Sequence, residues 1–290
     1  MKPSTHQAPD GSALARELHS RAGVGVAAHV LQGRGLQILR MRVDQPALIL
    51  VDRGIKTVKP ARGASVRGRP GQMLLLSGQQ TVDFTNDVAE GEHYEARWLV
   101  LHNALLEDAF YREAAARIAS VDSPLAPVRL LARVRTDLAD AFERGRQALA
   151  PDPALPDAVV RLRVLEVMQW LLEDGLVLRS APAEMNVSVQ VRALIAGRLD
   201  HDWTAARVAQ ALAMSEATLR RRLAAEGASM TALIVDARMA SALTLLQATT
   251  HPVSRIANAV GYDSPSRFAI RFRERFGFAP TVVRGHERQD

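Results

Sequence analysis

The last third of this 290-residue chain contains the same helical pattern twice. In the first copy, residues 203–223, apolar residues lie on both sides of a break at Ala213, and Ala209 lies where two helices would cross. The second copy, residues 252–276, has its small crossing residue at Ala257, 48 residues after Ala209. Two short helices that meet at a small side chain and a tight break are typical of a helix-turn-helix. We therefore predict two such units, each able to place its second helix in the major groove of DNA.

Residues that start and end helices support this division. Thr204 and Ser215 are suitable N-caps for the two helices of the first unit, because their hydroxyls accept hydrogen bonds from free backbone N–H groups. In the second unit, Ser264 and Pro265 suit an N-cap and the first helical position, and Gly261 suits the residue after the preceding helix. The predicted helix ends therefore match the apolar pattern.

An uninterrupted helical pattern over residues 231–249 connects the two units. Its apolar positions are Leu233, Ile234, Met239, Leu243 and Leu246. A helix of this size is about 28 Å long, and successive major grooves on one face of B-DNA lie roughly 34 Å apart. We expect this helix to hold the two recognition helices for successive grooves.

The positive charge is concentrated in the same region. Residues 188–290 contain 14 arginines and 9 acidic residues, a net charge of +5, whereas the whole chain carries +6. A basic segment joined to a nearly neutral one is typical of a nucleic-acid-binding module attached to a domain with another task. Arginine also provides the planar fork that suits phosphate and guanine.

The second unit and the residues after it carry a recognisable set of side chains. They are Ile256, Ala257, Gly261, Tyr262, Ser264, Ser266, Phe268, Phe272, Arg273, Phe276, Gly277 and Pro280. This set resembles the signature of the AraC/XylS family of bacterial transcription regulators. Residues 215–227 are similar to the branch that controls acid-stress, virulence and urease genes. The resemblance covers roughly residues 188–287, and Arg222, Ile270 and Val283 depart from the family pattern.

The resemblance implies a sequence-specific activator of transcription whose partners are double-stranded promoter DNA and RNA polymerase. The residues that it assigns to DNA are Glu216, Ala217, Thr218, Arg220, Arg221, Ser264, Ser266, Arg267 and Arg271. An arginine can bind guanine with two hydrogen bonds, a glutamate can accept from cytosine, and an alanine methyl can pack on thymine. Ile270 occupies a position where relatives often present a basic residue to DNA.

The upstream part changes character at about residue 103. Residues 24–102 contain short extended runs separated by Gly, Pro and Asp, which predicts a small β-barrel or sandwich. Helical periodicity follows over residues 104–174, with helices expected at 105–118, 128–148 and 157–172. The family resemblance implies a cupin-like β-barrel with dimerisation helices. We predict an α+β chain with a sensing and dimerisation domain over residues 1–179, a linker over 180–187 and a DNA-binding domain over 188–290.

The helix over residues 157–174 has an unusually wide apolar surface. One stripe comprises Val160, Val164, Val167 and Leu171, with Leu165, Met168 and Leu172 beside it and Trp170 on another side. Such a helix either packs on both sides within the core or meets the same helix of a second subunit. We expect a homodimer through this helix.

An enzyme is the alternative from another class. The chain has no Gly-x-Ser-x-Gly elbow and no Walker loop, and an extended run follows the glycines of residues 23–28. A cupin-like metal enzyme fused to a DNA-binding module would need His29, His93 and His102 to meet inside a barrel. Scattered histidines are more often structural. We therefore expect no enzyme activity, no cofactor and no metal.

Two further features limit the class of protein. The chain has no cysteine, which excludes disulfide scaffolds and cysteine-ligated metal sites. Apolar runs such as residues 46–51 are far shorter than the roughly 18 residues of a membrane span, and the first residues lack the pattern of a signal peptide. We expect a cytoplasmic protein with no membrane partner, whose apolar β domain holds a small effector.

Overall fold

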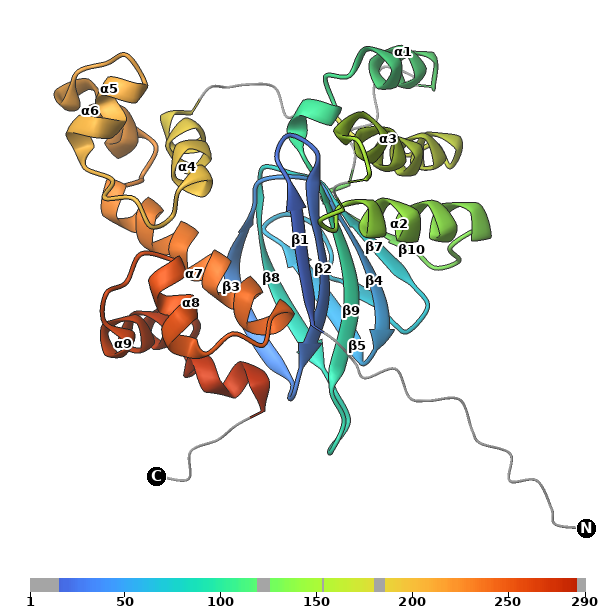
Figure 1. The fold of residues 1–290 in the computed structure, drawn as a ribbon, viewed down its shortest axis with the longest axis horizontal. Coiled ribbons are helices and arrows are strands. Elements are labelled where there is room, and N and C mark those ends of the chain that lie inside the picture. Colours follow the sequence, from blue (N-terminus) through green and yellow to red (C-terminus); the bar gives the residue numbers. More distant parts are fainter. Residues whose placement is uncertain (1–15, 119–125, 153, 180–185, 286–290) are drawn as a thin grey trace, which may run out of the picture.

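The computed structural model describes residues 16–118, 126–152, 154–179 and 186–285. Two antiparallel sheets form the first part of the chain (Figure 1). The larger sheet contains, in order across it, β1 (Glu17–Arg21), β2 (Gly25–Gln32), β9 (Tyr94–Leu101), β4 (Ala47–Arg53), β7 (Met73–Leu76) and β10 (Val128–Leu131). The smaller sheet contains β3 (Leu36–Val43), β8 (Gln80–Asp87), β5 (Ile55–Pro60) and β6 (Val66–Gly68).

The two sheets pack face to face around one apolar cluster. Val30 and Leu74 from the larger sheet and Ile38, Val58 and Phe84 from the smaller sheet belong to this cluster. The described strands therefore form a sandwich of two open sheets and no closed barrel. The coarser prediction of a β-rich N-terminal part followed by helices is confirmed.

Helices cover the outer face of the larger sheet. They are the short η1 (Asn103–Leu105), α1 (Ala109–Ile118), α2 (Thr136–Ala148) and α3 (Asp157–Glu173). Leu48 and Leu99 of the sheet pack with Phe142 of α2 and Leu171 of α3 in a second apolar cluster. Because it is covered on both faces, β4 begins with five consecutive buried residues.

The predicted helix over residues 128–148 is wrong in its first eight residues. Val128 to Leu131 form β10, which pairs with β7 from Val128 opposite Leu76 to Leu131 opposite Met73. A short apolar run has no periodicity that separates a strand from a helix. Pairing with a distant strand decided the conformation.

The apolar stripe of α3 is part of the core of its own chain. Val160, Val164, Val167 and Leu171 are each 0% exposed. The interpretation of this stripe as a contact with a second subunit is therefore wrong. Leu162, on another side of α3, is 63% exposed.

Leu171→Ala should lower the free energy of unfolding by about 2–5 kcal/mol, because it removes buried methyl groups and leaves a cavity. Leu162→Ala, on the exposed side of the same helix, should change it by no more than about 0.5 kcal/mol. Urea unfolding followed by circular dichroism measures both values. Similar losses for the two variants would contradict this assignment of the two sides.

The second part of the chain is helical. Its elements are α4 (Val187–Gly197), α5 (Ala205–Ala211), α6 (Glu216–Ala225), α7 (Met230–Ala248), α8 (Val253–Ala259), α9 (Pro265–Phe276) and the short η2 (Pro280–Arg284). Residues 180–185 of the predicted linker lie outside the described residues. Within the described ranges no single helix has the length and apolar composition of a membrane span. Only when α6 and α7 are taken together, with the bend of 71° between them, are that length and composition met.

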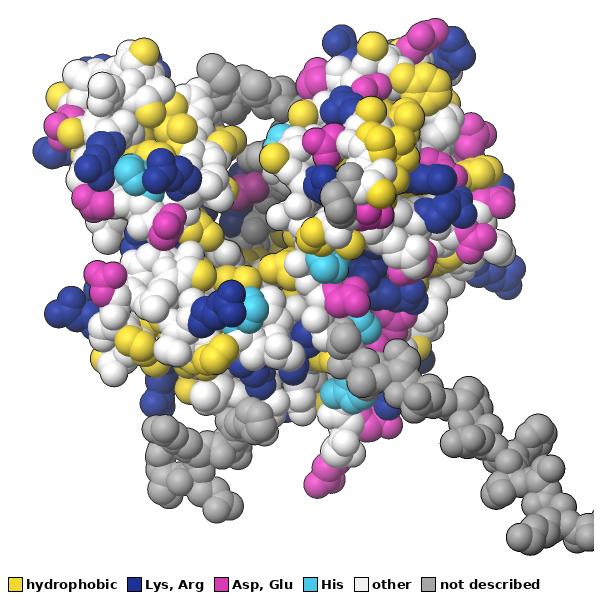
Figure 2. Space-filling view, viewed as in Figure 1, with side chains coloured by type: hydrophobic (Ala, Val, Ile, Leu, Met, Phe, Trp, Pro, Cys, Tyr) yellow, Lys and Arg dark blue, Asp and Glu magenta, His cyan; other side chains and the backbone are white. Residues whose placement is uncertain are grey.

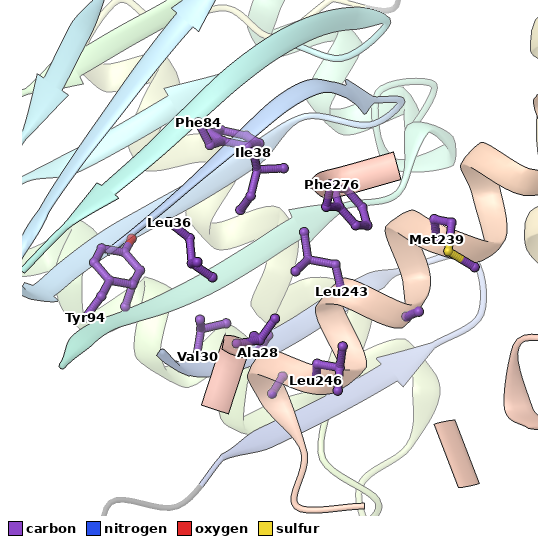
Figure 3. Packing of buried hydrophobic residues seen from close by; sticks show 14 of the residues in the cluster. Ala28, Val30, Leu36, Ile38, Phe84, Tyr94, Met239, Leu243, Leu246 and Phe276 are labelled. Atoms are coloured by element: carbon purple, nitrogen blue, oxygen red, sulfur yellow. The ribbon is translucent and has the colours of Figure 1, made fainter. Parts of the chain in front are cut away.

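The two halves of the helical part have different cores. Leu219, Leu223 and Leu233 belong to a separate cluster that α4 to α6 form with the start of α7. The rest of α7, with α8, α9 and η2, shares the cluster between the two sheets. Figure 3 shows Leu243 and Leu246 of α7 beside residues of the sheets.

Polar contacts also join the second half to the sheets. Arg275 of α9 donates to the carbonyl oxygens of Leu39 (3.0 Å) and Arg40 (2.7 Å) on β3. The amide N–H of Gly33, just after β2, donates to the carbonyl of Val283 in η2. The second half of the helical part is thus bonded directly to the N-terminal sheets.

Candidate nucleic-acid interface and interdomain cavity

The first helix-turn-helix consists of α5 and α6. The Thr204 hydroxyl accepts a hydrogen bond from the N–H of Arg207, and the Ser215 hydroxyl accepts one from the N–H of Thr218. Both predicted N-caps are therefore confirmed. The break between the helices contains Ala213 with φ +51°, a left-handed conformation that residues other than glycine rarely adopt.

The second unit, α8 and α9, has the same frame. The Ser264 hydroxyl accepts from the N–H of Arg267, and Pro265 is the first residue of α9, as predicted. Gly261 follows α8 with φ +80°. Gly261 lies 48 residues after Ala213, so the two units place their left-handed residue at the same point of the motif.

Gly261→Ala should destabilise the protein by more than about 1 kcal/mol, because an added Cβ would lie 2.7 Å from the guanidinium of Arg238 and 2.8 Å from the carbonyl of Leu199. Ala213→Gly should be neutral or stabilising, since glycine adopts positive φ without steric cost. Thermal unfolding of both variants provides the measurement. A neutral Gly261→Ala would contradict the close approach at this turn.

On α6 the structure exposes most of the predicted DNA-binding side chains. Glu216, Ala217, Arg220 and Arg221 are exposed, whereas Thr218 is half-buried. Glu216 and Arg220 form an ion pair at 3.5 Å. The side chain of Arg221 has no hydrogen-bond or ion-pair partner among the described residues. Arg221 therefore has no acidic neighbour to leave before it binds a base.

On α9 the predicted side chains divide in the same way. Ser266, Arg267 and Arg271 are exposed, whereas Ser264 is half-buried and caps the helix. Arg271 pairs with Glu274 at 2.8 Å, while the side chain of Arg267 makes no such contact within the described ranges. Figure 1 shows that α6 and α9 lie beside different parts of α7.

Ile270 is a further functional candidate on α9, at a position where the sequence departs from the family pattern. Its side chain is 60% exposed, and it lines the same surface hollow as Arg267 and Arg271. An exposed β-branched residue between two arginines suits contact with a thymine methyl group. The sequence contained a signal for this residue, because Ile270 lies one helical turn after Ser266, which is a predicted DNA contact.

A cavity of about 410 Å³ lies between the sheets and α7. Its walls are largely apolar and include Ile38, Phe84 and Trp98 from the sheets and Leu243 from α7. Lys56 of β5 is a charged residue in this lining and is only 2% exposed. The cavity therefore combines apolar walls with one buried amine.

The amine of Lys56 has an unusual environment. Nζ donates to Oδ1 of Asn86 at 3.0 Å and lies 4.1 Å from the centre of the Phe84 ring and 5.5 Å from that of Trp98. No carboxylate within the described ranges pairs with it. Burial lowers the pKa of Lys56 to about 7, because an apolar site disfavours the charged amine.

The composition of the chain contains a signal for this residue that none of the sequence predictions used. The chain has 34 arginines and only three lysines, of which Lys56 is one. Arginine stays protonated in proteins, whereas a buried lysine can release its proton. The two lysines of β5, Lys56 and Lys59, are therefore candidates for binding an anion, and burial singles out Lys56.

A series of hydrogen bonds connects this amine to the helical domain. Asn86, which accepts from Lys56, donates to Oε1 of Gln32 at 3.0 Å. Gln247 of α7 donates to the same oxygen at 2.9 Å. The buried polar groups thus run from the smaller sheet through β2 to the helix that joins the two helix-turn-helix units.

The histidines required by the enzyme alternative do not meet. His29 and His93 both contact Glu95, at 2.8 and 3.5 Å. His102 instead caps η1, where its Nδ1 accepts from the N–H of Ala104. The constellation of three histidines that the enzyme alternative requires is therefore not formed.

Comparisons with known proteins agree with this geometry. A family model described as a helix-turn-helix domain matches residues 208–286. The regulator GadX of Escherichia coli is 34% identical over 105 residues, 36% of this chain and 38% of GadX. The regulator SirC of Salmonella typhimurium is 39% identical over 87 residues, 30% of each chain. The matched region thus spans about a third of each relative.

Solved structures resemble the chain over nearly its whole length. ToxT from Vibrio cholerae has a TM-score of 0.59 at 14% identity, covering 89% of this chain and 97% of ToxT. A ToxT structure with a bound unsaturated fatty acid has a TM-score of 0.55 at 12% identity, covering 93% of this chain and 99% of ToxT. At this identity the likeness establishes the two-domain fold alone.

Proposed function

We propose that the whole chain is a transcription regulator that recognises promoter DNA in the cytoplasm. The proposal starts from residues 208–286, which belong to the AraC/XylS family of DNA-binding domains. The observation that carries this proposal is the pair of capped, exposed helices α6 and α9, joined by the 19-residue α7. Two recognition helices on one rigid connector suit two successive major grooves. Contact with RNA polymerase would make the chain an activator.

We assign direct base contacts first to Arg221 and Arg267, because their side chains have no partner within the described ranges. Arg220 and Arg271 must leave their acidic neighbours before they bind DNA, which suits them to phosphate contacts. Ile270 would add an apolar contact to a thymine methyl group on the second half of the site.

Arg221→Ala should weaken binding to the cognate promoter by about 1–3 kcal/mol and relax the preference at one base pair, because it removes a two-bond contact with guanine. Fluorescence anisotropy on a promoter fragment found by chromosomal footprinting measures this. Arg117→Ala, which removes the same charge from α1, is the matched control. An equal loss on random DNA would reassign Arg221 to phosphate.

We further propose that the cavity beside Lys56 binds an amphipathic carboxylate as effector. The apolar walls suit a hydrocarbon chain, and the single amine suits a negatively charged head group. The bound fatty acid of the structurally similar ToxT supports this class of ligand. Because the cavity touches both the sheets and α7, a ligand there would change the DNA affinity of the helical domain by a coupling energy of about 1–3 kcal/mol.

Binding of oleate at pH 8.5 should be accompanied by proton uptake, since a carboxylate beside Lys56 raises a pKa that burial had lowered to about 7. Isothermal titration calorimetry in two buffers of different ionisation enthalpy measures the protons taken up. Lys56→Met should bind more weakly and without proton uptake. Equal binding with equal uptake in the two proteins would place the head group elsewhere.

We also propose that the chain is a homodimer, through the exposed side of α1 and α3 and not through the buried stripe. Phe110 (64% exposed) and Leu162 (63% exposed) flank a hollow that Leu165 and Trp170 also line. Figure 2 shows hydrophobic side chains gathered over these helices. An apolar patch with charged neighbours such as Arg161 is typical of an interface.

Leu162→Glu should produce folded monomers, because it places a charge in the proposed interface without touching the core. Sedimentation velocity at micromolar concentration gives the oligomeric state, and circular dichroism verifies folding. Leu39→Glu, at an exposed leucine of β3 (47% exposed), serves as the control. A wild-type monomer at this concentration would contradict the proposal.

A further inference from the structure

A second cluster of titratable side chains lies on the larger sheet, outside the cavity and the DNA-binding helices. His29 of β2, Glu95 of β9 and Asp52 of β4 come from three neighbouring strands. One ligand atom from each lies within 4.8 Å of the others. Trp98, which lines the cavity, lies an odd number of residues from Glu95, so the two side chains point to opposite faces of the sheet.

Glu95 is the centre of this cluster. Its Oε1 lies 2.8 Å from Nε2 of His29, and its Oε2 lies 3.5 Å from Nε2 of His93, which immediately precedes β9. Nε2 of His93 is shielded from solvent and has no hydrogen-bond partner among the described residues. Such an orphaned nitrogen beside a carboxylate is a free ligand position.

The arginines near Glu95 form ion pairs with other carboxylates. Arg97 binds both oxygens of Asp52, at 2.7 and 3.0 Å, and also contacts Glu143. Arg146 pairs with Glu143 as well. Within the described part of the chain, no arginine or lysine pairs with Glu95, whose side chain is only 12% exposed.

We propose that His29, His93 and Glu95 bind a divalent transition-metal ion, with zinc as the ion that this donor set fits best. Two imidazole nitrogens and one carboxylate, with a position left for water, form a common zinc ligand set, with bonds of about 2.0–2.2 Å. His29 and Glu95 already lie within ligand distance of each other, at 2.8 Å, and with Asp52 they place one ligand atom each within 4.8 Å of the others. His93 lies outside this group and joins the ion by rotation of its ring from its present position, 3.5 Å from the second oxygen of Glu95. Asp52, held by Arg97, lies beside the ion as a second carboxylate.

The bound ion would connect β2 to β9 and to the residue that precedes β9. It would stabilise this domain, because it binds the folded sheet, whereas in the unfolded chain His29 is far from His93 and Glu95. The site is independent of the proposed effector cavity, which lies on the opposite face of the sheet.

The test is a titration of the metal-free, full-length protein with zinc chloride in competition with a colorimetric chelator. One high-affinity zinc ion per chain is expected, with a rise in melting temperature. Glu95→Gln, which keeps the size of the side chain, should weaken binding by more than about 10-fold, because loss of even an outer-shell partner of a metal costs about 10–100-fold, and His93→Asn should do the same. His251→Asn, whose side chain lies in the helical domain, should leave the affinity unchanged.

Equal zinc affinity of the wild-type protein and Glu95→Gln would overturn the proposal, as would failure of the wild-type protein to compete with the chelator. Cobalt substitution tests the site without any variant. The wild-type protein with cobalt should show the intense visible absorption bands of a four- or five-coordinate ion. Only the weak bands of hexaaqua cobalt would also overturn the proposal.

Discussion

The packing of α7 against the two sheets is the contact on which the rest of the structure depends. Leu243 and Leu246 belong to the same apolar cluster as the residues between the sheets, and the first turns of α7 complete the core of the first helix-turn-helix unit. One helix is therefore shared by the N-terminal sheets and both helix-turn-helix units. Close-packed interfaces shift between discrete arrangements, so α7 is the element through which the proposed effector would act on both recognition helices.

The buried polar groups at this interface add a second constraint. The hydrogen bonds from Lys56 through Asn86 and Gln32 to Gln247 satisfy polar atoms that would otherwise be costly to bury. This series of hydrogen bonds ends at an apolar cavity that reaches both domains. A ligand that engages Lys56 would therefore change the hydrogen bonding of α7 directly. In the proposed regulation, these four side chains are sufficient to connect the ligand to α7.

Much of the DNA-binding frame was predictable because short-range interactions specify it. Caps such as Ser215 and Ser264 bond to N–H groups three residues away, and Gly261 ends its helix through its own backbone conformation. The sequence did not predict which arginines lack an ion-pair partner, because ion pairs such as that of Arg271 depend on side-chain positions. The cavity was also not predictable from the sequence, since residues that line it, such as Lys56 and Gln247, are 191 residues apart in the chain.

By itself the sequence determined the two helix-turn-helix units, their spacing of 48 residues and the boundaries of α3 and α7 to within about one residue, because periodicity and capping act within a few residues. Tertiary structure decided the rest. It made residues 128–131 a strand by pairing them with β7, and it buried the stripe of α3 against the chain's own sheet. It also brought His29 and Asp52 to Glu95 from neighbouring strands. These outcomes depend on contacts between residues far apart in the chain, whose positions no local pattern specifies.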